Sequence, residues 1–300
     1  MAETASLAQH NVVRQRAEQM AAALPPLMVA AERVAATVAQ GVHGRRRVGI
    51  GETFWQFRRY DAGDPAQAID WRQSAKTQKL FVRENEWEAA QSVWLWRDGS
   101  PSMDFRSDAA EQDKLERSTL LLLALAALLV RGGERIALLG VDDAPSTGRA
   151  ALTRMAQSLI GNKPLATPSL PDIARVPRYA QIVLIGDFLS PMPEIDAAIK
   201  TFAGQGARGH LMQVLDPAEE DLPYNGRMLF EGVEGEGSIT IGRVEGLRAD
   251  YHARIAARRE NLSVTARSVG WTCAFHRTDR PPQTALLSLY SALADALVTA

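Results

Sequence analysis

A short apolar run that ends abruptly in a polar loop constrains the fold of this chain more than any other stretch. Residues 93–96 are Val-Trp-Leu-Trp, and they lead into a loop with Asp98, Ser100 and Ser102 at alternating positions. Such a run, bounded by turn residues, is typical of a strand buried on both faces of a parallel sheet. Open α/β sheets bind their ligands just beyond the carboxyl ends of their strands. We therefore expect this loop to lie at the functional edge of a parallel sheet.

Strand-like and helix-like segments alternate along the rest of the chain. Apolar runs typical of buried strands occur at residues 135–141, 181–186, 210–216 and 271–276, and helical patterns cover about residues 109–130, 149–160, 194–202, 247–269 and 282–298. An order of strand, helix and strand indicates right-handed βαβ units. The sequence therefore predicts an α/β fold with a mainly parallel central sheet and helices packed on it.

Composition divides the chain into three regions. Residues 1–40 are rich in Ala, Gln, Glu and Arg with apolar residues at helical spacing, so we expect a helical extension outside the main domain. Residues 41–91 alternate aromatic and charged residues, which predicts short strands and structured loops. Residues 92–300 form the α/β domain, and two β-rich stretches around a Gly/Glu-rich turn predict a hairpin insertion at 217–246.

The bulk properties exclude several classes of protein. A net charge of −1 argues against a dedicated nucleic-acid binder. The single cysteine, Cys273, excludes an intramolecular disulfide and a thiolate metal cluster, and it fits a reducing compartment. The most apolar run, residues 119–130, is shorter than the roughly 20 residues of a membrane helix, and the amino-terminal residues do not resemble a secretory signal. We expect a cytoplasmic protein without membrane insertion.

Oxygen-bearing side chains follow three of the expected strands. Asp98, Ser100 and Ser102 follow the first, Thr147 the second and Asp187 the third. Loops after parallel strands emerge at one edge of the sheet, so these groups can converge there and bind Mg²⁺, with Mn²⁺ or Ca²⁺ as alternative ions. Ser146 is an alternative to Thr147. In the competing interpretation, Asp98 and the serines only cap the next helix and bond loop amides.

Residues 45–104 carry further motifs in a fixed order. They are Gly49, Gly51 and Phe54; Arg58 and Tyr60; Gly63 and Asp64; Ile69, Asp70 and Trp71; and Val82, Arg83 and Glu86. This series resembles the bacterial family called domain of unknown function 58, and the order of the polar loops resembles a von Willebrand factor A-type domain with a metal-ion-dependent adhesion site. The resemblance implies a three-layer Rossmann-like fold. It also implies a partner among MoxR-type AAA+ ATPases and a role in the assembly or maturation of other proteins.

The motif segment itself has two interpretations. Five of the six tryptophans lie between residues 55 and 96, so the segment must pack firmly against something. It is either a small satellite core with solvated charges or a surface on which a partner docks. In the second case the candidate partner-binding residues are Arg58, Tyr60, Asp64, Asp70, Trp71 and Arg83.

Three hypotheses of function follow. The leading one is a non-enzymatic interaction module, in which the bound ion accepts an acidic side chain from a partner protein. A second is a metal-dependent hydrolase at the same edge of the sheet, which would need a histidine base beside a serine, with His210 or His276 as candidates. The serines do not lie in a Gly-x-Ser-x-Gly elbow, and the five histidines lack metal-ligand spacing. The third is a metal-free scaffold that binds through residues 45–88.

Overall fold

The computed structural model describes residues 26–39, 48–60, 69–76, 79–86, 92–161, 168–235 and 237–298. The chain divides into two compact units, one formed by Met1–Gln40 with Ser92–Ala300 and the other by Gly41–Gln91.

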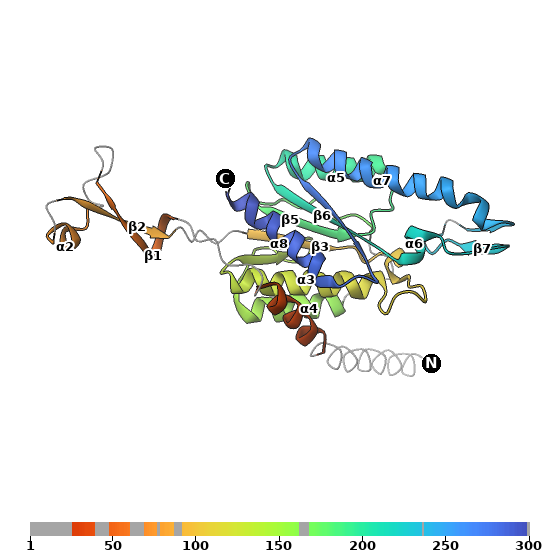
Figure 1. Ribbon diagram of the computed structural model, residues 1–300, viewed down its shortest axis with the longest axis horizontal. Coiled ribbons are helices and arrows are strands. Elements are labelled where there is room, and N and C mark those ends of the chain that lie inside the picture. Colours follow the sequence, from red (N-terminus) through yellow and green to blue (C-terminus); the bar gives the residue numbers. More distant parts are fainter. Residues whose placement is uncertain are drawn as a thin grey trace, which may run out of the picture. The chain divides into compact units, whose positions relative to one another are not determined.

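A five-stranded parallel sheet forms the centre of the larger unit (Figure 1). Its strands lie in the order β4-β3-β5-β6-β9, and all four neighbouring pairs are parallel. Their bounds are β3 Ser92–Arg97, β4 Arg135–Leu138, β5 Gln181–Gly186, β6 Arg208–Leu215 and β9 Thr272–Arg277. Because the connections between them are helical, the expected α/β class with a mainly parallel central sheet is confirmed.

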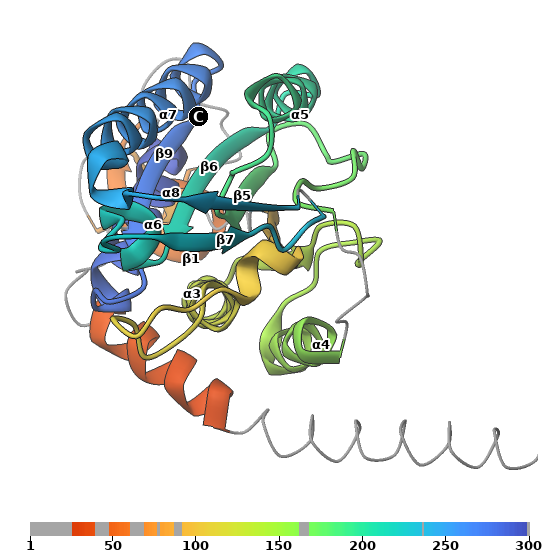
Figure 2. The same ribbon diagram turned by 90° about the vertical axis from the view of Figure 1, so that its right-hand side faces the viewer.

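Helices cover both faces of this sheet (Figures 1 and 2). On one face lie α3 Lys114–Arg131, α4 Gly148–Gly161 and α8 Pro282–Val298, and on the other lie α5 Met192–Gly204 and α7 Arg248–Ser268. Helix α3 carries the long apolar run, and its residues 118–129 are all buried because it contacts four strands as well as α4 and α8. In the described part of the chain, no helix has the length and apolarity needed to cross a membrane.

Large apolar side chains join the sheet to α5 and α7. Trp94 and Trp96 of β3 enter this cluster with Phe202 of α5 and with Trp271, which precedes β9. Alternation along the strand then directs Val93 and Leu95 to the opposite face, where α3 lies. Gly209 leaves room for the Trp271 ring, because a Cβ at Gly209 would lie 2.1 Å from it. The sheet is therefore buried on both faces.

The helix at residues 26–39 belongs to the larger unit. Ala31, Val34, Ala35 and Val38 are buried, and their spacing places them on one side of the helix. Burying that apolar stripe requires contact with other elements, so this part of the expected extension packs within the larger unit.

An insertion follows β6. It contains α6 Pro217–Asp221, the antiparallel strands β7 Met228–Glu231 and β8 Ser238–Ile241, and the short helix η3 Val244–Leu247. Figures 1 and 2 place the β7–β8 hairpin beyond the carboxyl ends of the sheet strands, across the edge at which β3 and β5 end. We call this edge the carboxyl edge.

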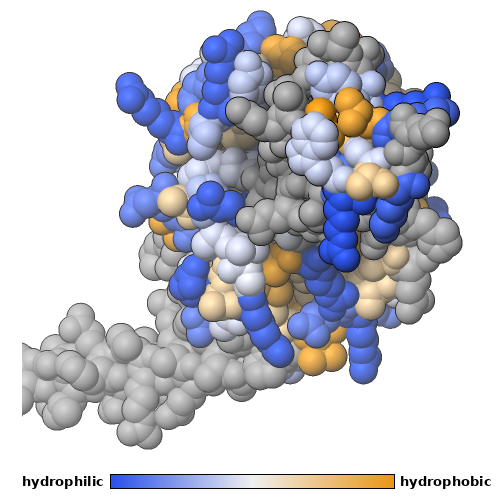
Figure 3. All heavy atoms as spheres, turned by 90° about the vertical axis from the view of Figure 1, so that its left-hand side faces the viewer, coloured by the Kyte–Doolittle hydropathy of each residue, from blue (hydrophilic) through white to orange (hydrophobic). Residues whose placement is uncertain are grey.

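Exposed apolar side chains gather on the hairpin. Leu229 is 56% exposed, Val233 56% and Ile239 62%. Figure 3 shows the side opposite to the one in Figure 2, and there the coloured apolar side chains lie in small groups between charged ones.

The smaller unit is built on an antiparallel pair of strands. Strand β1 Val48–Arg59 pairs with β2 Phe81–Glu86, and the single-turn helix α2 Trp71–Ser74 lies between them in the chain. Asp70 accepts a hydrogen bond from the Gln73 backbone N–H at 2.8 Å and so caps α2. Ser74 Oγ accepts one from the Phe81 N–H at 2.9 Å, which joins the helix to β2.

Candidate functional site

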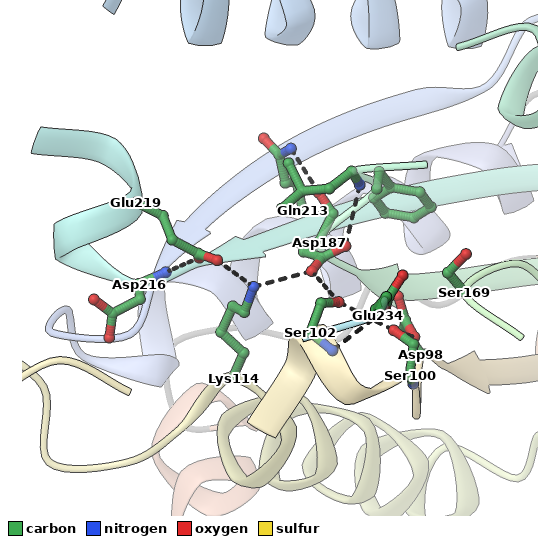
Figure 4. A network of polar contacts seen from close by, with 12 residues as sticks. Asp98, Ser100, Ser102, Lys114, Ser169, Asp187, Gln213, Asp216, Glu219 and Glu234 are labelled. Atoms are coloured by element: carbon green, nitrogen blue, oxygen red, sulfur yellow. Dashed lines mark hydrogen bonds and ion pairs between the residues drawn. The ribbon is translucent and has the colours of Figure 1, made fainter. Parts of the chain in front are cut away.

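Four of the five predicted metal ligands meet at the carboxyl edge (Figure 4). Asp98 follows β3 and Asp187 follows the neighbouring β5, and the Asp98 N–H donates to the Ile185 carbonyl at 2.8 Å. Ser100 donates to Asp98 Oδ1 from its N–H at 2.8 Å and from its hydroxyl at 2.7 Å. Ser102 Oγ donates to Asp187 Oδ2 at 2.7 Å and lies 3.1 Å from Ser100 Oγ. The two hydroxyls thus stand between the two carboxylates.

One carboxylate oxygen of this cluster is buried without a hydrogen-bond partner. Asp98 has no exposed surface, and within the described residues its Oδ2 accepts no hydrogen bond. Burial, and then the nearby charge of Asp187, raise the pKa of Asp98 to about 7. A buried charged oxygen without a partner is costly. A cation at this point would remove that cost.

A buried lysine, which the sequence reasoning missed, lies on the other side of Asp187. Lys114 begins α3 and is fully buried, with its Nζ 2.9 Å from Asp187 Oδ2 and 2.5 Å from Glu219 Oε1 of α6. Burial opposes its charge, but the attraction of the two carboxylates outweighs burial, and the pKa of Lys114 is raised. A signal was present in the sequence, because a lysine in the first turn of a helix is disfavoured by the helix dipole and needs another reason.

The donor set suits one hard divalent cation. The two serine hydroxyls and the unpaired Asp98 Oδ2 are oxygens, which Mg²⁺ prefers. Within the described residues, no three His, Cys, Asp or Glu side chains are grouped as direct metal ligands. An ion here would therefore depend on the hydroxyls and on water for much of its shell. Lys114 already neutralises part of the charge of Asp187, which lowers the affinity for the ion.

Thr147 is not brought to this cluster. Strand β4 ends at Leu138 rather than at the expected residue 141, and the chain then turns back, so that Ser146 pairs with Ile136 in antiparallel fashion. Ile136 lies beside Val93, near the start of β3 and far from Asp98. Thr147 is exposed at that end, and Ser146 Oγ accepts a hydrogen bond from Arg154. The predicted ligand set was wrong in this residue, because the loop after β4 doubles back.

Another serine lies on the Asp98 side of the cluster instead. Ser169 comes from the segment between α4 and β5, and its hydroxyl is 2.6 Å from Ser190 Oγ. Figure 4 shows it beside Asp98 and Ser100, away from Lys114. No strand-end pattern marks Ser169 in the sequence, because it precedes its strand by more than ten residues.

The segment after Asp187 is held in an unusual conformation. Phe188 is buried and has a φ of 50°, in the left-handed region. Arg258 of α7 donates to the carbonyls of Phe188 and Ser190, and Gln213 Nε2 donates to the Asp187 carbonyl at 2.8 Å. These bonds fix the direction in which Asp187 presents its carboxylate.

The oxygen cluster lies in a part of the chain that matches a known protein family. Residues 56–261 match the model of a family described as "Protein of unknown function DUF58". The chain belongs to this family. The matched range runs from β1 into α7 and includes the whole oxygen cluster, Lys114 and the β7–β8 hairpin.

Relatives of this DUF58 protein occur in mycobacteria. It is 27% identical over 278 residues to uncharacterized protein Rv1480 of Mycobacterium tuberculosis and likewise to uncharacterized protein Mb1516 of Mycobacterium bovis, and each match covers 87% of this chain and 86% of the relative. Among solved structures, an aerotolerance-related membrane protein from Bacteroides fragilis is 15% identical with a TM-score of 0.40, over 69% of this chain and 100% of that one. BatB from Bacteroides thetaiotaomicron is 15% identical with a TM-score of 0.39, over 69% and 99%.

The predicted partner-binding residues of the DUF58 protein have different surroundings. Asp70 is engaged as the cap of α2, and Tyr60 is half-buried with its N–H bonded to the Leu80 carbonyl. Trp71 is 65% exposed. Arg58 and Arg83 lie on the paired strands β1 and β2, and Asp64 lies outside the described residues. Trp71 is thus the most accessible of those whose side chains the structure describes.

Neither of the two histidines considered as bases contacts the serines through a hydrogen bond, and in the described residues His276 Nε2 is buried without a partner. His210 bonds to Thr272 Oγ1 at 2.8 Å and to Gln181 Oε1 at 3.3 Å, inside the sheet. Burial lowers the pKa of both His210 and His276 to about 4. In the described part of the chain, neither histidine is hydrogen-bonded to Ser100 or Ser102.

Proposed function

We propose that this DUF58 protein is a non-enzymatic interaction module of the von Willebrand factor A type. In this proposal Asp98, Ser100, Ser102 and Asp187 hold a divalent cation, Mg²⁺ in the cell, and the ion receives an acidic side chain of a partner protein. The observation that carries the proposal is the buried, unpartnered Asp98 Oδ2 beside two converging hydroxyls.

The arrangement of the fold supports the assignment to this type. The first central strand ends in Asp98, Ser100 and Ser102, and the adjacent parallel strand ends in Asp187. Neutral hydroxyl ligands leave most of the charge of the ion unneutralised, and this favours one further anionic ligand from outside. The resemblance to the family suggests the partner, a MoxR-type AAA+ ATPase, and a role in protein assembly or maturation.

Binding is better supported than hydrolysis. A serine nucleophile needs a neighbouring base that takes its proton. The hydroxyl of Ser102 donates to Asp187 Oδ2, and the same oxygen is already paired with the Lys114 ammonium. His210 bonds to Thr272 and Gln181, and within the described residues neither His210 nor His276 is hydrogen-bonded to either serine.

A metal titration tests the proposal. Calorimetry with Mn²⁺ should detect binding to the wild-type protein, and Mg²⁺ should compete. Ser102→Ala should abolish binding, because it removes one of the two hydroxyls. Thr147→Ala is the matched control, since it removes an exposed hydroxyl away from the cluster, and it should bind as the wild type does. Wild-type protein that binds no Mn²⁺ at millimolar concentration would overturn the metal site.

The partner requires a separate measurement. A purified MoxR-type AAA+ ATPase from the same organism should bind the wild-type protein in Mg²⁺, and much more weakly in EDTA or to Ser102→Ala. Binding that is indifferent to both changes would instead favour the metal-free scaffold.

A metal-free scaffold is the second candidate, because Trp71 is 65% exposed in the motif segment. Exposed tryptophans are frequent anchors of protein interfaces. This candidate predicts binding that depends on Trp71 and not on a cation.

A further inference from the structure

A carboxylate from the insertion reaches the proposed metal site. Glu234 lies in the connection between β7 and β8, 132 residues from Ser102 in the chain, and its Oε1 accepts a hydrogen bond from the Ser102 N–H at 3.3 Å. Figure 4 shows Glu234 beside Asp98, Ser100 and Ser102, and Figure 2 shows the hairpin across the carboxyl edge. The hairpin thus brings an acidic side chain to the place where the proposed function requires one.

The direction of Glu234 is unexpected for a surface carboxylate. Glu234 is exposed, and charged side chains at the tips of hairpins normally point into water. Here it accepts a hydrogen bond from the Ser102 N–H and lies beside Asp98, in the site to which Asp187 also belongs. Like charges repel unless a cation lies among them. The geometry therefore suits a site in which a positive ion is bound.

The hairpin can move away without opening the core. In the described residues β7 and β8 pair only with each other. Gly232, Gly235 and Gly237 surround Glu234, and the last two have φ values of 92° and 87°. The side chains of Leu229 and Ile239 are more than half exposed. Displacing the tip of the hairpin thus costs little apolar burial.

We propose that Glu234 is an internal competitor, whose carboxylate occupies the position that the acidic side chain of a partner takes on the ion. A partner then binds only by displacing the hairpin tip, so the insertion sets the threshold for binding. The inference rests on the proposed function, since it needs the ion. Aspartates 98 and 187 with Glu234 form no three-carboxylate cluster of direct ligands, so Glu234 supplies one oxygen to a site made mainly of hydroxyls and water.

Water-proton relaxation of bound Mn²⁺ tests this inference, with acetate as the probe for an external carboxylate. Each protein is saturated with Mn²⁺, so the measured enhancement reports the water molecules that exchange rapidly on the bound ion. Glu234→Gln should show a larger relaxation enhancement than the wild type, because water replaces the carboxylate. In Glu234→Gln, acetate should quench the enhancement at about a tenfold lower concentration than in the wild type. In the wild type the tethered Glu234 carboxylate competes with acetate at an effective concentration on the order of millimolar.

Glu231→Gln is the matched control, because Glu231 is an exposed glutamate of the same hairpin, and it should behave as the wild type does. Equal enhancement and equal acetate response in all three proteins, with Mn²⁺ bound in each, would overturn the role of Glu234 and leave the metal site intact. Wild-type protein that binds no Mn²⁺ would overturn both.

Discussion

Gly186 and Asp98 face each other so closely that no side chain fits between them. A Cβ on Gly186 would lie 2.8 Å from Asp98 Cβ and 3.2 Å from its Oδ2. Gly186 is the last residue of β5, directly before Asp187. The close approach of the two strand ends therefore depends on the absence of a side chain at this position.

Gly186→Ala should therefore displace Asp98. We expect a loss of roughly 1–3 kcal/mol in the free energy of unfolding, as for other overpacked cores, and much weaker Mn²⁺ binding. Urea unfolding and calorimetry measure the two effects. Gly204→Ala is the control, because a Cβ at Gly204 meets nothing within 4 Å and Gly204 ends helix α5. If Gly186→Ala bound Mn²⁺ as the wild type does, the position of Asp98 would not matter for the site.

Replacing Lys114 should separate stability from metal affinity. Lys114→Met keeps the apolar stem but leaves Asp187 and Glu219 without their cation. We expect a loss of about 3–5 kcal/mol in EDTA. Mn²⁺ should then bind several-fold more tightly than to the wild type, because it no longer competes with the ammonium, and should restore part of the stability.

Lys200→Met is the matched control for that change. Lys200 pairs with Asp196 on the surface, where such pairs contribute roughly 0–1 kcal/mol. It should alter neither property. Unchanged or weaker Mn²⁺ affinity in Lys114→Met would contradict the competition between lysine and ion.

The pH dependence of stability in EDTA should carry the signature of Asp98. Its pKa is raised to about 7 in the folded protein, first by burial and then by Asp187, whereas an unfolded aspartate titrates near 4. Between these values the folded state binds more protons, so the contribution of Asp98 to the free energy of unfolding falls as pH rises, by about 4 kcal/mol at most. His210 and His276, with pKa values lowered to about 4, act in the opposite direction. Their contribution to the free energy of unfolding falls as pH is lowered from about 6.5.

Comparison with Asp98→Asn isolates the contribution of this carboxyl group, since the histidines are the same in both proteins. The variant should gain stability relative to the wild type as pH is raised from about 5 to about 8. Urea unfolding at a series of pH values gives the difference. A difference that stays constant over this range would mean that Asp98 titrates normally.

Trp71→Ala distinguishes the two candidate modes of binding. Trp71 is 65% exposed, so its loss should change the free energy of unfolding by less than about 0.5 kcal/mol. If the metal site binds the partner, the affinity for a MoxR-type AAA+ ATPase in Mg²⁺ should persist in this variant and be lost in Ser102→Ala. The reverse result would transfer the function to the motif segment.

The sequence was sufficient to predict the sheet and the meeting of four of the five candidate ligands at one edge, because their signals are local. Each buried strand is an apolar run bounded by turn residues, and Asp98 and Asp187 directly follow such runs. Thr147 followed a strand in the same way, but the turn at Asp142, whose carboxylate accepts the Leu138 N–H, sends the chain back along β4. No local pattern distinguishes a loop that continues from one that returns.

The remaining parts of the site are contacts between distant segments. Lys114 is 73 residues from Asp187 and 105 from Glu219. One sequence contains no signal that pairs such positions, because the pairing arises only when α3, β5 and α6 pack together. The same applies to Glu234. The sequence predicts its hairpin but not the contact of that hairpin with Ser102.

The insertion after β6 reaches the carboxyl edge at two points. Its first helix, α6, provides Glu219 to Lys114, and its hairpin provides Glu234 to Ser102. A change at either end therefore reaches the same few atoms around Asp187. A relative with a shorter insertion would lose both the carboxylate that pairs with the lysine and the carboxylate beside the ion. Its site would therefore differ in its affinity for the ion and in its affinity for a partner.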